Sequence, residues 1–508
     1  MPDDELCVLA PLRVEAAAAR RGARRADVHR TGMGRRRSEH AARRLAARLA
    51  WHEPVAIVGV CGAIDPNLRP GDVVVASELR SSDGTVRLPL PAAPLLAREV
   101  AALGLPVHCG PLVTSERLAT GTTRTDLAAD GAVAVDMESA WLAAGVSTDE
   151  RPRPLAVVRI VLDTPSHRLA SPGTLRRLRL ARRRISSVMP AVERWGQVTG
   201  PRQVLLASPR SFCAGVERAI EIVERALDRF RPPVYVRRQI VHNTHVVRGL
   251  EARGAVFVHE VDDVPPGSVV VLAAHGVAPE VREAAERRDL TVIDATCPLV
   301  AKVHSEARRF VARDYDVVLI GHEGHEEVEG TVGEAPDRIT LVGSIDEIDR
   351  LHVRDPERVA YLTQTTLAVD EAATIVDHLR SRYPSLVGPR SEDICYATQN
   401  RQEAVAAVAP DVDLMLVVGS QNSSNSLRLA EVAARSGATA HLVDGCEDIA
   451  LEWLDGVAAV GITAGASAPE WKVREVVAAI GGLGPIAVEE RIEHVESVAF
   501  ALPAEVRP

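Results

Sequence analysis

The stretch QVLLASPRSFCAGVERAIEIVERAL, residues 203–227, contains a strand signal, a turn and a helix signal in direct succession. The apolar run QVLLAS predicts a buried strand, and the apolar spacing of GVERAIEIVERAL predicts an amphipathic helix. A cysteine, Cys213, lies at the turn between them. A strand followed by a helix is the repeating unit of α/β folds. The stretch therefore predicts the fold class, and it leaves one thiol to be explained.

Two further cysteines occupy the same kind of turn. Cys297 lies in TVIDATCPLVAKVHSEARRFVA, residues 291–312, and Cys395 lies in SEDICYATQNRQEAVAAVA, residues 391–409. Both stand directly before a helical pattern. Strand and helix signals alternate along most of the chain, which predicts an α/β protein with largely parallel sheets.

The chain has 508 residues, which is too long for a single hydrophobic core. At VERWGQVTGPRQ, residues 192–203, a helical pattern ends, Gly and Pro intervene, and a new strand begins. This pattern predicts a first domain of residues 1–198 and a second of residues 199–508. Basic residues exceed acidic ones in the first part and the reverse holds in the second, which favours two domains of different origin.

The composition argues against several classes of function. Aromatic residues make up only 3% of the chain, which is too few for base-stacking platforms. The longest apolar runs are too short to span a bilayer, and the N-terminal residues lack an apolar signal core. We therefore expect a cytoplasmic protein without a nucleic-acid or membrane partner. The arginine-rich run at residues 174–195 is typical of a solvated helix face, although such a run can also bind a polyanion.

The three cysteines that precede helices are candidate metal ligands. Loops at the carboxyl ends of parallel strands gather at one edge of a sheet, and a helix N-terminus favours a thiolate. Three thiolates can hold an iron–sulfur cluster, with one iron left without a protein ligand. The alternative is that all three are buried and serve as small apolar residues. Their spacing alone does not separate the two.

Polar side chains also follow several predicted strands. His325 and Glu327 are two residues apart, so that one turn can present both as a proton-transfer pair. Hydroxyl and amide groups at a helix start predict an anion site, although ordinary helix capping needs only one of them. The residues at such positions are His242, His275, His322, Thr365, Thr366, Ser423, Ser424, Asn425 and Ser467.

Residues 203–500 resemble the 4-hydroxy-3-methylbut-2-enyl diphosphate reductases, the last enzymes of the methylerythritol phosphate route to isoprenoids. The strings that carry the resemblance are FCAGVERAI, VHN, AHGV, DATCPLV, GHEGHEEVEGT, TQTTL, DICYATQNRQ, GSQNSSNS and TAGASAP, in family order. One departure is Glu326, where the family commonly has Pro between the histidine and the acid. The resemblance implies three α/β units in a trefoil around a 4Fe–4S cluster.

The resemblance also implies a role for each matching residue. Cys213, Cys297 and Cys395 match the cluster ligands, and Glu327 matches the proton source. Thr365 matches the residue that contacts the substrate hydroxyl, and His325 matches a histidine that faces the substrate. The implied diphosphate pocket consists of His242, His275, Ser423, Ser424, Asn425 and Ser467. The implied reaction is a reductive dehydration that yields isopentenyl and dimethylallyl diphosphates, with electrons from a carrier such as ferredoxin or flavodoxin.

The first domain resembles the nucleoside phosphorylase and methylthioadenosine nucleosidase family in short strings: TGMG, AIVGVCGAIDPNLRPGDVVVAS, VDMESAW and VVRIVLDT. The resemblance implies an α/β domain in which Met137 and Glu138 hold ribose hydroxyls, Asp163 protonates a purine leaving group and Glu15 activates water. Arg35 is the candidate for a phosphate contact. The context VLDTPSH around Asp163 departs from the family, and no purine-stacking aromatic residue is evident. Either an active nucleosidase or phosphorylase, or a catalytically inert domain, fits the sequence.

Two further hypotheses stay open for the whole protein. The chain can be an iron–sulfur redox sensor, for which the Arg-rich first part is the only support, or a structural zinc protein that uses the same thiols. A sensor needs neither Glu327 nor Thr365 nor the pocket of hydroxyls. The sequence does not decide the oligomeric state, the electron donor, or whether the first domain uses water or phosphate.

Overall fold

The computed structural model describes residues 6–50, 52–119, 122–147, 152–167, 169, 171 and 173–507. The chain divides into two compact units, which are described separately. Unit 1 consists of residues 1–204, 445–460 and 474–489, and unit 2 consists of residues 205–444, 461–473 and 490–508. Helices and strands alternate through both, which confirms the predicted α/β class.

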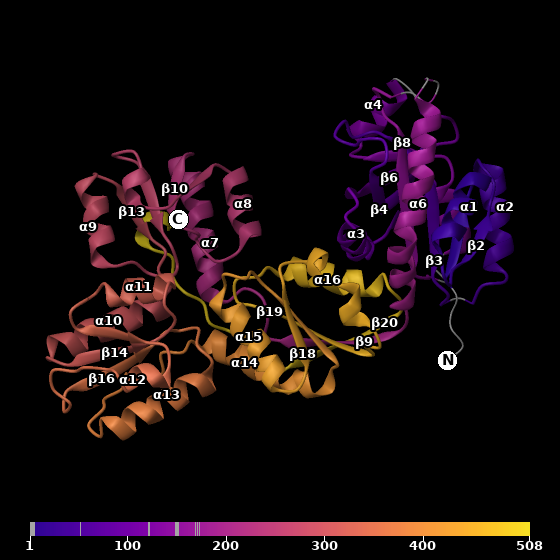
Figure 1. Ribbon diagram of the computed structural model, residues 1–508. Helices are drawn as coiled ribbons and strands as arrows, with labels where there is room; N and C mark the ends of the chain where they lie inside the picture. Colours follow the sequence, from indigo (N-terminus) through magenta and orange to yellow (C-terminus); the bar gives the residue numbers. More distant parts are fainter. Residues whose placement is uncertain are drawn as a thin grey trace. The chain divides into compact units, whose positions relative to one another are not determined.

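Unit 1 contains an eight-stranded sheet (Figure 1). Its path runs β2-β1-β3-β7-β6-β4-β5, and β8 pairs with both β3 and β4. The pairs β1–β3, β3–β8 and β4–β6 are parallel, whereas β3–β7, β4–β5 and β4–β8 are antiparallel. The strands are β1 (Cys7–Ala10), β2 (Asp27–Arg30), β3 (Val55–Ala63), β4 (Val73–Ser81), β5 (Arg87–Pro89), β6 (Val107–Thr114), β7 (Ala134–Asp136) and β8 (Leu155–Asp163).

The described residues up to residue 200 form the helices α1 (Arg13–Gly22), α2 (Arg35–Ala46), α3 (Ala93–Ala102), α4 (Thr122–Ala129), α5 (Ser139–Val146) and α6 (Thr174–Gln197). The longest, α6, packs against α1 and β8. It ends at Gln197, where the sequence predicted the end of a helix. Its outer positions carry the arginine run, while Ile185, Val188 and Trp195 are buried.

Unit 2 contains two fully parallel sheets. The first has the order β11-β10-β12-β13 and the second has the order β15-β14-β16. The strands are β10 (Val234–Arg237), β11 (Ala255–Val258), β12 (Val269–Leu272), β13 (Thr291–Asp294), β14 (Asp316–Ile320), β15 (Ile339–Val342) and β16 (Val359–Thr363). The helices are α7 (Ala214–Phe230), α8 (Thr244–Ala252), α9 (Pro279–Arg287), α10 (Pro298–Ala312), α11 (Glu326–Val332), α12 (Ile345–Ile348) and α13 (Val369–Arg382).

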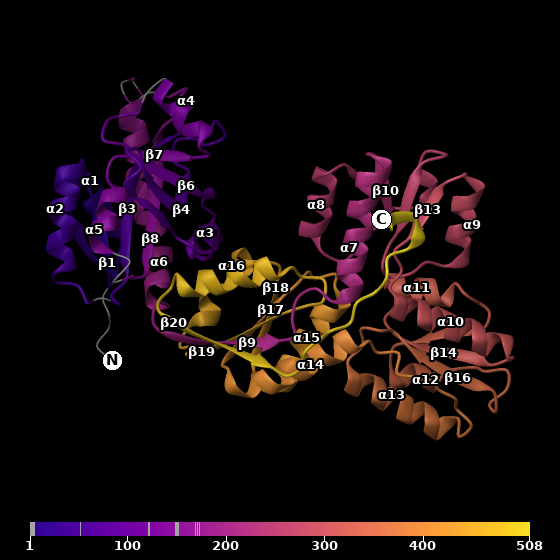
Figure 2. The same cartoon turned by 180° about the vertical axis from the view of Figure 1, so that it is seen from behind.

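A further sheet of five strands has the order β18-β17-β19-β9-β20. Its strands are β9 (Arg202–Ser208), β17 (Leu414–Val418), β18 (Thr439–Val443), β19 (Ala459–Ala464) and β20 (Ile486–Ile492). The helices of this region are α14 (Tyr396–Val408), α15 (Ser424–Arg435) and α16 (Glu470–Gly481). Figure 2 shows the three sheets that follow residue 200, each with its own helices.

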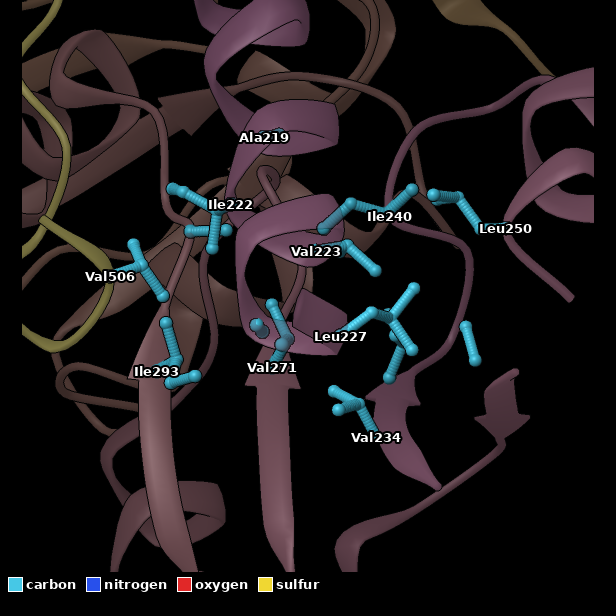
Figure 3. Close-up of a cluster of buried hydrophobic side chains, with 14 of the residues drawn as sticks. Ala219, Ile222, Val223, Leu227, Val234, Ile240, Leu250, Val271, Ile293 and Val506 are labelled. Atoms are coloured by element: carbon cyan, nitrogen blue, oxygen red, sulfur yellow. The ribbon is translucent and has the colours of Figure 1, made fainter. Parts of the chain in front are cut away.

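The helix that begins at the first cysteine is fixed by its apolar face. In α7, Ala219, Ile222, Val223 and Leu227 recur at helical spacing and are buried in one core cluster. Val506, from the C-terminal segment, joins this cluster beside Ile222 (Figure 3). This core thus holds α7, the helix that begins directly after Cys213, against its sheet. None of the helices in the described part of the chain combines the length and the apolar character needed to cross a membrane.

Candidate functional site

The three cysteines that precede helices occupy equivalent positions in unit 2. Cys213, Cys297 and Cys395 are the N-cap residues of α7, α10 and α14, respectively. All three line one cavity with a volume of about 110 Å³. The strand–turn–helix pattern of the sequence therefore brings together three thiols that lie 84 and 98 residues apart along the chain.

The sulfur atoms lie close enough to affect one another. Burial, and then the neighbouring Cys213, raise the pKa of the Cys395 thiol to about 12. Burial raises the pKa of Cys297 to about 11, and Cys213 adds to the shift. Three thiolates in one buried place require a compensating positive charge, which a bound metal supplies. Three cysteines that line one cavity match the donor set of an iron–sulfur cluster with three protein ligands.

Gly215 leaves space beside these sulfurs. A Cβ atom at this position would lie 2.8 Å from the Sγ of Cys297 and 3.8 Å from the Sγ of Cys213. The first distance is shorter than a real contact, so a side chain here would push on a sulfur atom. The glycine keeps a volume between two sulfurs open, as a polyatomic cluster requires.

A group of histidines forms another wall of the cavity. The rings of His242 and His275 stack with centroids 4.1 Å apart, and the ring of His325 meets both edge-on. Burial lowers the pKa of His242 to about 2 and that of His325 to about 4. These two rings are neutral at neutral pH. Within the described part of the chain, neither ring nitrogen of His242 has a hydrogen-bond partner.

The candidate acid lines the same cavity. Glu327 is 3% exposed, on the first turn of α11, and burial raises its pKa. Its Oε1 accepts the amide N–H of Thr365 at 2.7 Å, and its Oε2 accepts the hydroxyl of Thr365 at 2.9 Å. The Nδ1 of His325 accepts the amide of Glu327 at 3.2 Å and so caps the same helix. A buried carboxyl with a raised pKa is suited to donate a proton.

Hydroxyl and amide groups at the start of α15 form the remaining wall. Ser423 is the N-cap residue, and its Oγ lies 3.2 Å from the Oγ of Ser467. The Oγ of Ser424 accepts the hydroxyl of Thr366 at 3.1 Å. Asn425 is buried and accepts the amide of Ala466 through Oδ1 at 3.0 Å. These groups, together with a helix N-terminus, offer hydrogen-bond donors to an anion without a full positive charge.

Every residue to which the resemblance gives a role in the reductase site lines this cavity. His322 does not line it; its Nε2 lies 3.8 Å from Glu371 instead. Two residues of the site were missed. Thr398 connects the Sγ of Cys395, at 3.1 Å, with the Nδ2 of Asn425, at 3.3 Å. Glu326 was noted only as a departure, and its Oε2 lies 3.6 Å from the Nδ1 of His275.

Unit 1 contains a second group of buried charges. Glu15, on α1, is 2% exposed and accepts the amides of Leu12 and Val60. Burial raises the pKa of Glu15. Burial, followed by the charge of Asp136, raises the pKa of Glu138 to about 7. The fully buried Arg159 pairs with Asp136 at 2.6 Å.

Arg159 also lies close to Glu15. A Cβ atom at Gly59 would meet the Nη1 of Arg159 at 2.2 Å and the Oε1 of Glu15 at 2.9 Å. The structure thus places Glu15 near this arginine, which the sequence analysis did not identify. Met137, next to Glu138, is half-buried.

Two other candidate residues of unit 1 form ion pairs that the sequence did not predict. Asp163, at the end of β8, forms a buried ion pair with Arg124, which also donates to the carbonyls of Ala119 and Ala63. Arg35 donates to three carboxylates and lies over the ring of Trp141. Those acceptors are Glu39 at 2.8 Å, Asp83 at 2.9 Å and Glu116 at 2.7 Å. A phosphate would have to compete with three negative charges for this guanidinium.

Two family models match different parts of the chain. The model of the LytB protein family matches residues 204–481, and the model of the phosphorylase superfamily matches residues 20–184. A 4-hydroxy-3-methylbut-2-enyl diphosphate reductase of Mycolicibacterium paratuberculosis is 58% identical over 307 residues, which cover 60% of this chain and 92% of that protein. The reductase of Leifsonia xyli subsp. xyli is 58% identical over 311 residues, with coverages of 61% and 92%.

A solved structure shares the fold of the second part. The E-1-hydroxy-2-methyl-but-2-enyl-4-diphosphate reductase from Plasmodium falciparum is 37% identical, with a TM-score of 0.58. The match covers 60% of this chain and 97% of that chain. The resemblances drawn from the sequence strings are therefore confirmed, that of the first domain by its superfamily match. The chain belongs to the LytB protein family and carries an additional phosphorylase-like N-terminal part.

Proposed function

We propose that the LytB-like part of this chain reduces 4-hydroxy-3-methylbut-2-enyl diphosphate to isopentenyl and dimethylallyl diphosphates. The observation that carries the proposal is one cavity lined by three cysteine sulfurs, a buried carboxyl group and a set of neutral anion-binding groups. The substrate has matching parts: a diphosphate for the hydroxyl wall, and an allylic alcohol that must gain two electrons and two protons.

The cofactor of this proposal is a 4Fe–4S cluster held by Cys213, Cys297 and Cys395. When bound, such a cluster supplies electrons one at a time and an iron that acts as a Lewis acid. Each of the three cysteines stands at a helix N-terminus, whose positive end favours a thiolate, and the Sγ of Cys395 accepts the amide N–H of Thr398 at 3.3 Å. The electrons come from an external carrier of the ferredoxin or flavodoxin class.

The diphosphate binds to Ser423, Ser424, Asn425 and Ser467, with the neutral histidines beside them. A neutral imidazole donates one hydrogen bond and adds no charge. These neutral groups hold the anion through directed hydrogen bonds and not through a strong ion pair. Because the substrate is short, binding of its diphosphate also orients the hydroxyl group at its other end. Such orientation lowers the activation barrier of the reaction.

Glu327 holds one of the two protons. In the carboxylate form, both bonds from Thr365 point at its oxygens. When Oε2 is protonated, the Thr365 hydroxyl must accept instead of donate, and its own hydrogen becomes available to the cavity. A proton can therefore reach the substrate oxygen through this hydroxyl, and that oxygen leaves as water. The second proton is delivered to carbon, which balances the two electrons.

Complementation tests this proposal in the cell. A bacterium whose own hydroxymethylbutenyl diphosphate reductase is depleted should grow when it expresses the intact chain, and it should not grow with the Cys213→Ser variant at equal protein level. Absence of growth with the intact chain, despite a full iron–sulfur complement in the purified protein, would favour a redox sensor. Zinc in place of iron would favour a structural role.

We propose a second activity, the cleavage of a purine nucleoside, for the N-terminal part. The observation that favours it is the buried group of Glu15, Asp136, Glu138 and Arg159, because buried charges of this number stabilise a fold poorly and are typical of functional sites. Glu138 is suited to exchange a proton near neutral pH. Purine release by the intact chain that is lost in Glu138→Gln supports the proposal; no release from any purine nucleoside, with or without phosphate, supports an inert domain.

A further inference from the structure

Each helix that begins at a candidate cluster cysteine carries a cation in its second turn. Arg218 follows Cys213 on α7, and Lys302 follows Cys297 on α10, each by five residues. On α14, Arg401 follows Cys395 by six residues. The proposed mechanism uses none of these cations. All three side chains donate hydrogen bonds to the turn that precedes another of the three cysteines.

Arg218 joins the first cysteine helix to the second cysteine turn. Its Nη1 donates to the carbonyls of Ala295 and Thr296, each at 3.1 Å. These are the two residues directly before Cys297. The Arg218 guanidinium thus holds the two peptide groups that precede Cys297. Its own helix, α7, begins directly after Cys213.

Lys302 joins the second cysteine helix to the third cysteine turn. Its Nζ donates to the carbonyl of Glu392 at 2.7 Å and to the Oδ1 of Asp393 at 3.0 Å. The carbonyl of Ser391 is a third acceptor. The Asp393 side chain is fully buried, and it also accepts the amide of Thr363 at the end of β16. An ammonium group has three donors, and Lys302 uses them on three consecutive residues that precede Cys395.

Arg401 joins the third cysteine helix back to the first cysteine turn. Its Nε and Nη2 donate to the carbonyl of Ser211 at 3.2 and 2.8 Å, and Nη2 also donates to the carbonyl of Phe212 at 3.4 Å. Its Nη1 donates to the carbonyl of Ala397 and to Glu496. The side chain is completely buried, and these five bonds match the five N–H groups of a guanidinium.

The turn that Arg401 holds is strained. Ser211 has a φ of 62°, in the left-handed region that non-glycine residues seldom adopt. Such a conformation persists only where its surroundings enforce it. Besides the bonds from Arg401, the Ser211 hydroxyl donates to Glu470 at 2.7 Å, and the amide of Cys213 donates to the carbonyl of Ala466 at 3.3 Å. The position of Cys213 is therefore determined by several contacts around it.

We infer that Arg218, Lys302 and Arg401 form a closed ring of positioning residues that sets the spacing of the three cysteine sulfurs. Arg218 connects the helix after Cys213 to the turn before Cys297. Lys302 connects the helix after Cys297 to the turn before Cys395. Arg401 connects the helix after Cys395 to the turn before Cys213. This inference rests on the proposed function only in naming a cluster as the group that the sulfurs hold. We call these three side chains the cation ring.

The C-terminal segment closes over part of the cation ring. The Nε of Arg218 donates to the carbonyl of Ala501 at 2.8 Å, and Glu496 accepts from Arg401 at 3.0 Å. This segment runs from β20 past α14 to α7 (Figures 1 and 2). The Glu496 carboxylate of this segment compensates the positive charge of Arg401, which is completely buried. A buried charge without a partner would destabilise the fold.

The test uses the intact chain with its cluster, purified without oxygen. The variants are Arg218→Gln and Lys302→Gln, with Lys302→Arg as the conservative replacement. The matched control is Arg338→Gln, because Arg338 also donates to a carbonyl, that of Tyr315 at 2.8 Å, but within the β14–β16 sheet and away from the cysteines. The readouts are the rate of iron loss to a chelator and the electron paramagnetic resonance spectrum of the reduced cluster.

We expect Arg218→Gln and Lys302→Gln to accelerate iron loss about tenfold, the size of effect that loss of a charged hydrogen bond produces, and to change the spectrum. Lys302→Arg should restore both. The Arg338→Gln variant should leave both unchanged. If the control accelerates iron loss as much as the ring variants do, or if the ring variants match the parent chain, the inference is wrong.

A second readout needs no cluster. The cluster-free full-length chain is titrated with phenylarsine oxide, which bridges two neighbouring thiols, and its affinity reports the spacing of the sulfurs. The ring variants should bind it more weakly than the parent chain and Arg338→Gln. If the parent chain assembles no cluster, the proposed function fails, while this titration still decides the cation ring: equal affinity in all variants overturns it.

Discussion

Both oxygens of the Glu327 carboxyl group are bound by the same residue, Thr365, through its amide at 2.7 Å and its hydroxyl at 2.9 Å. The two residues come from different elements, α11 and the loop after β16. Burial raises the pKa of Glu327 while these two bonds lower it. The hydroxyl of Thr365 must reverse its direction when Glu327 takes up a proton, so the pair works as one unit.

Replacement of Glu327 by Gln should abolish product formation and leave the cluster intact. Glutamine fills the same volume but carries no exchangeable acid proton. We expect a loss of turnover of about a hundredfold or more, the usual contribution of a general acid. Turnover and the iron content of the same sample provide the measurement. Parent-level turnover would remove Glu327 from the mechanism.

Replacement of Thr365 by Val should also lower turnover, because valine has the same shape but no hydroxyl. The amide bond to Glu327 remains, so the carboxyl group keeps its place. We expect a smaller loss than in Glu327→Gln, and the double variant should be no worse than Glu327→Gln alone, since the two act as one unit. Additive losses would show that the two residues act separately.

Substitution of Ser for any one of Cys213, Cys297 or Cys395 should prevent stable cluster assembly. The matched controls are two other cysteines, Cys109, which is exposed, and Cys446, which is buried in unit 1. Iron and sulfide analysis after anaerobic purification provides the measurement. A full cluster in a variant of the first group, or its loss in Cys109→Ser or Cys446→Ser, would contradict the assignment of ligands.

Alanine at Gly215 should reduce the amount of cluster without removing a ligand. The added Cβ would lie 2.8 Å from the Sγ of Cys297, so that this sulfur or α7 must move. We expect faster iron loss than in the parent chain. A suitable control is Gly249→Ala, because no atom lies within 4 Å of a Cβ at that position. Equal behaviour of the two variants would mean that the space at Gly215 is not needed.

Acidification should destabilise the substrate-free protein through its buried histidines. The folded pKa of His242 is lowered to about 2, below the ordinary 6.5, so its contribution to stability is present above pH 6.5 and is lost as the pH falls below that value. Between pH 7.5 and 5.5 the loss amounts to roughly 1 kcal/mol. The thermal midpoint of unit 2 should fall over this range, and it should fall less in His242→Asn. An identical fall in both proteins would contradict the burial of a neutral ring.

The sequence brought the candidate residues of one cavity together because these residues share one structural position. Cysteines and histidines that follow strands, or precede helices, must meet at the carboxyl edges of parallel sheets. Thr398 was missed, because the sequence does not show that its hydroxyl lies close to both the Sγ of Cys395 and the side-chain amide of Asn425. The cation ring was also missed, since Arg401 and its acceptor Ser211 are 190 residues apart.

The N-terminal part was less accessible to sequence reasoning. Asp163 was expected as a proton donor, but Arg124 on a separate helix forms an ion pair with it. The antiparallel pairing of β8 with β4 was also not predicted, because the direction of a pair depends on connections that the hydrophobic pattern does not encode. Segments 445–460 and 474–489, which the sequence grouped with the second domain, cluster with unit 1 in the structure.

The most direct test of the account is an anaerobic turnover assay. The intact chain is mixed with a chemically reduced electron carrier and 4-hydroxy-3-methylbut-2-enyl diphosphate, and both five-carbon diphosphate products are followed over time. We expect the parent chain to form isopentenyl and dimethylallyl diphosphates and the Cys213→Ser variant to form neither. A parent chain with a complete cluster that forms neither product would contradict the central claim.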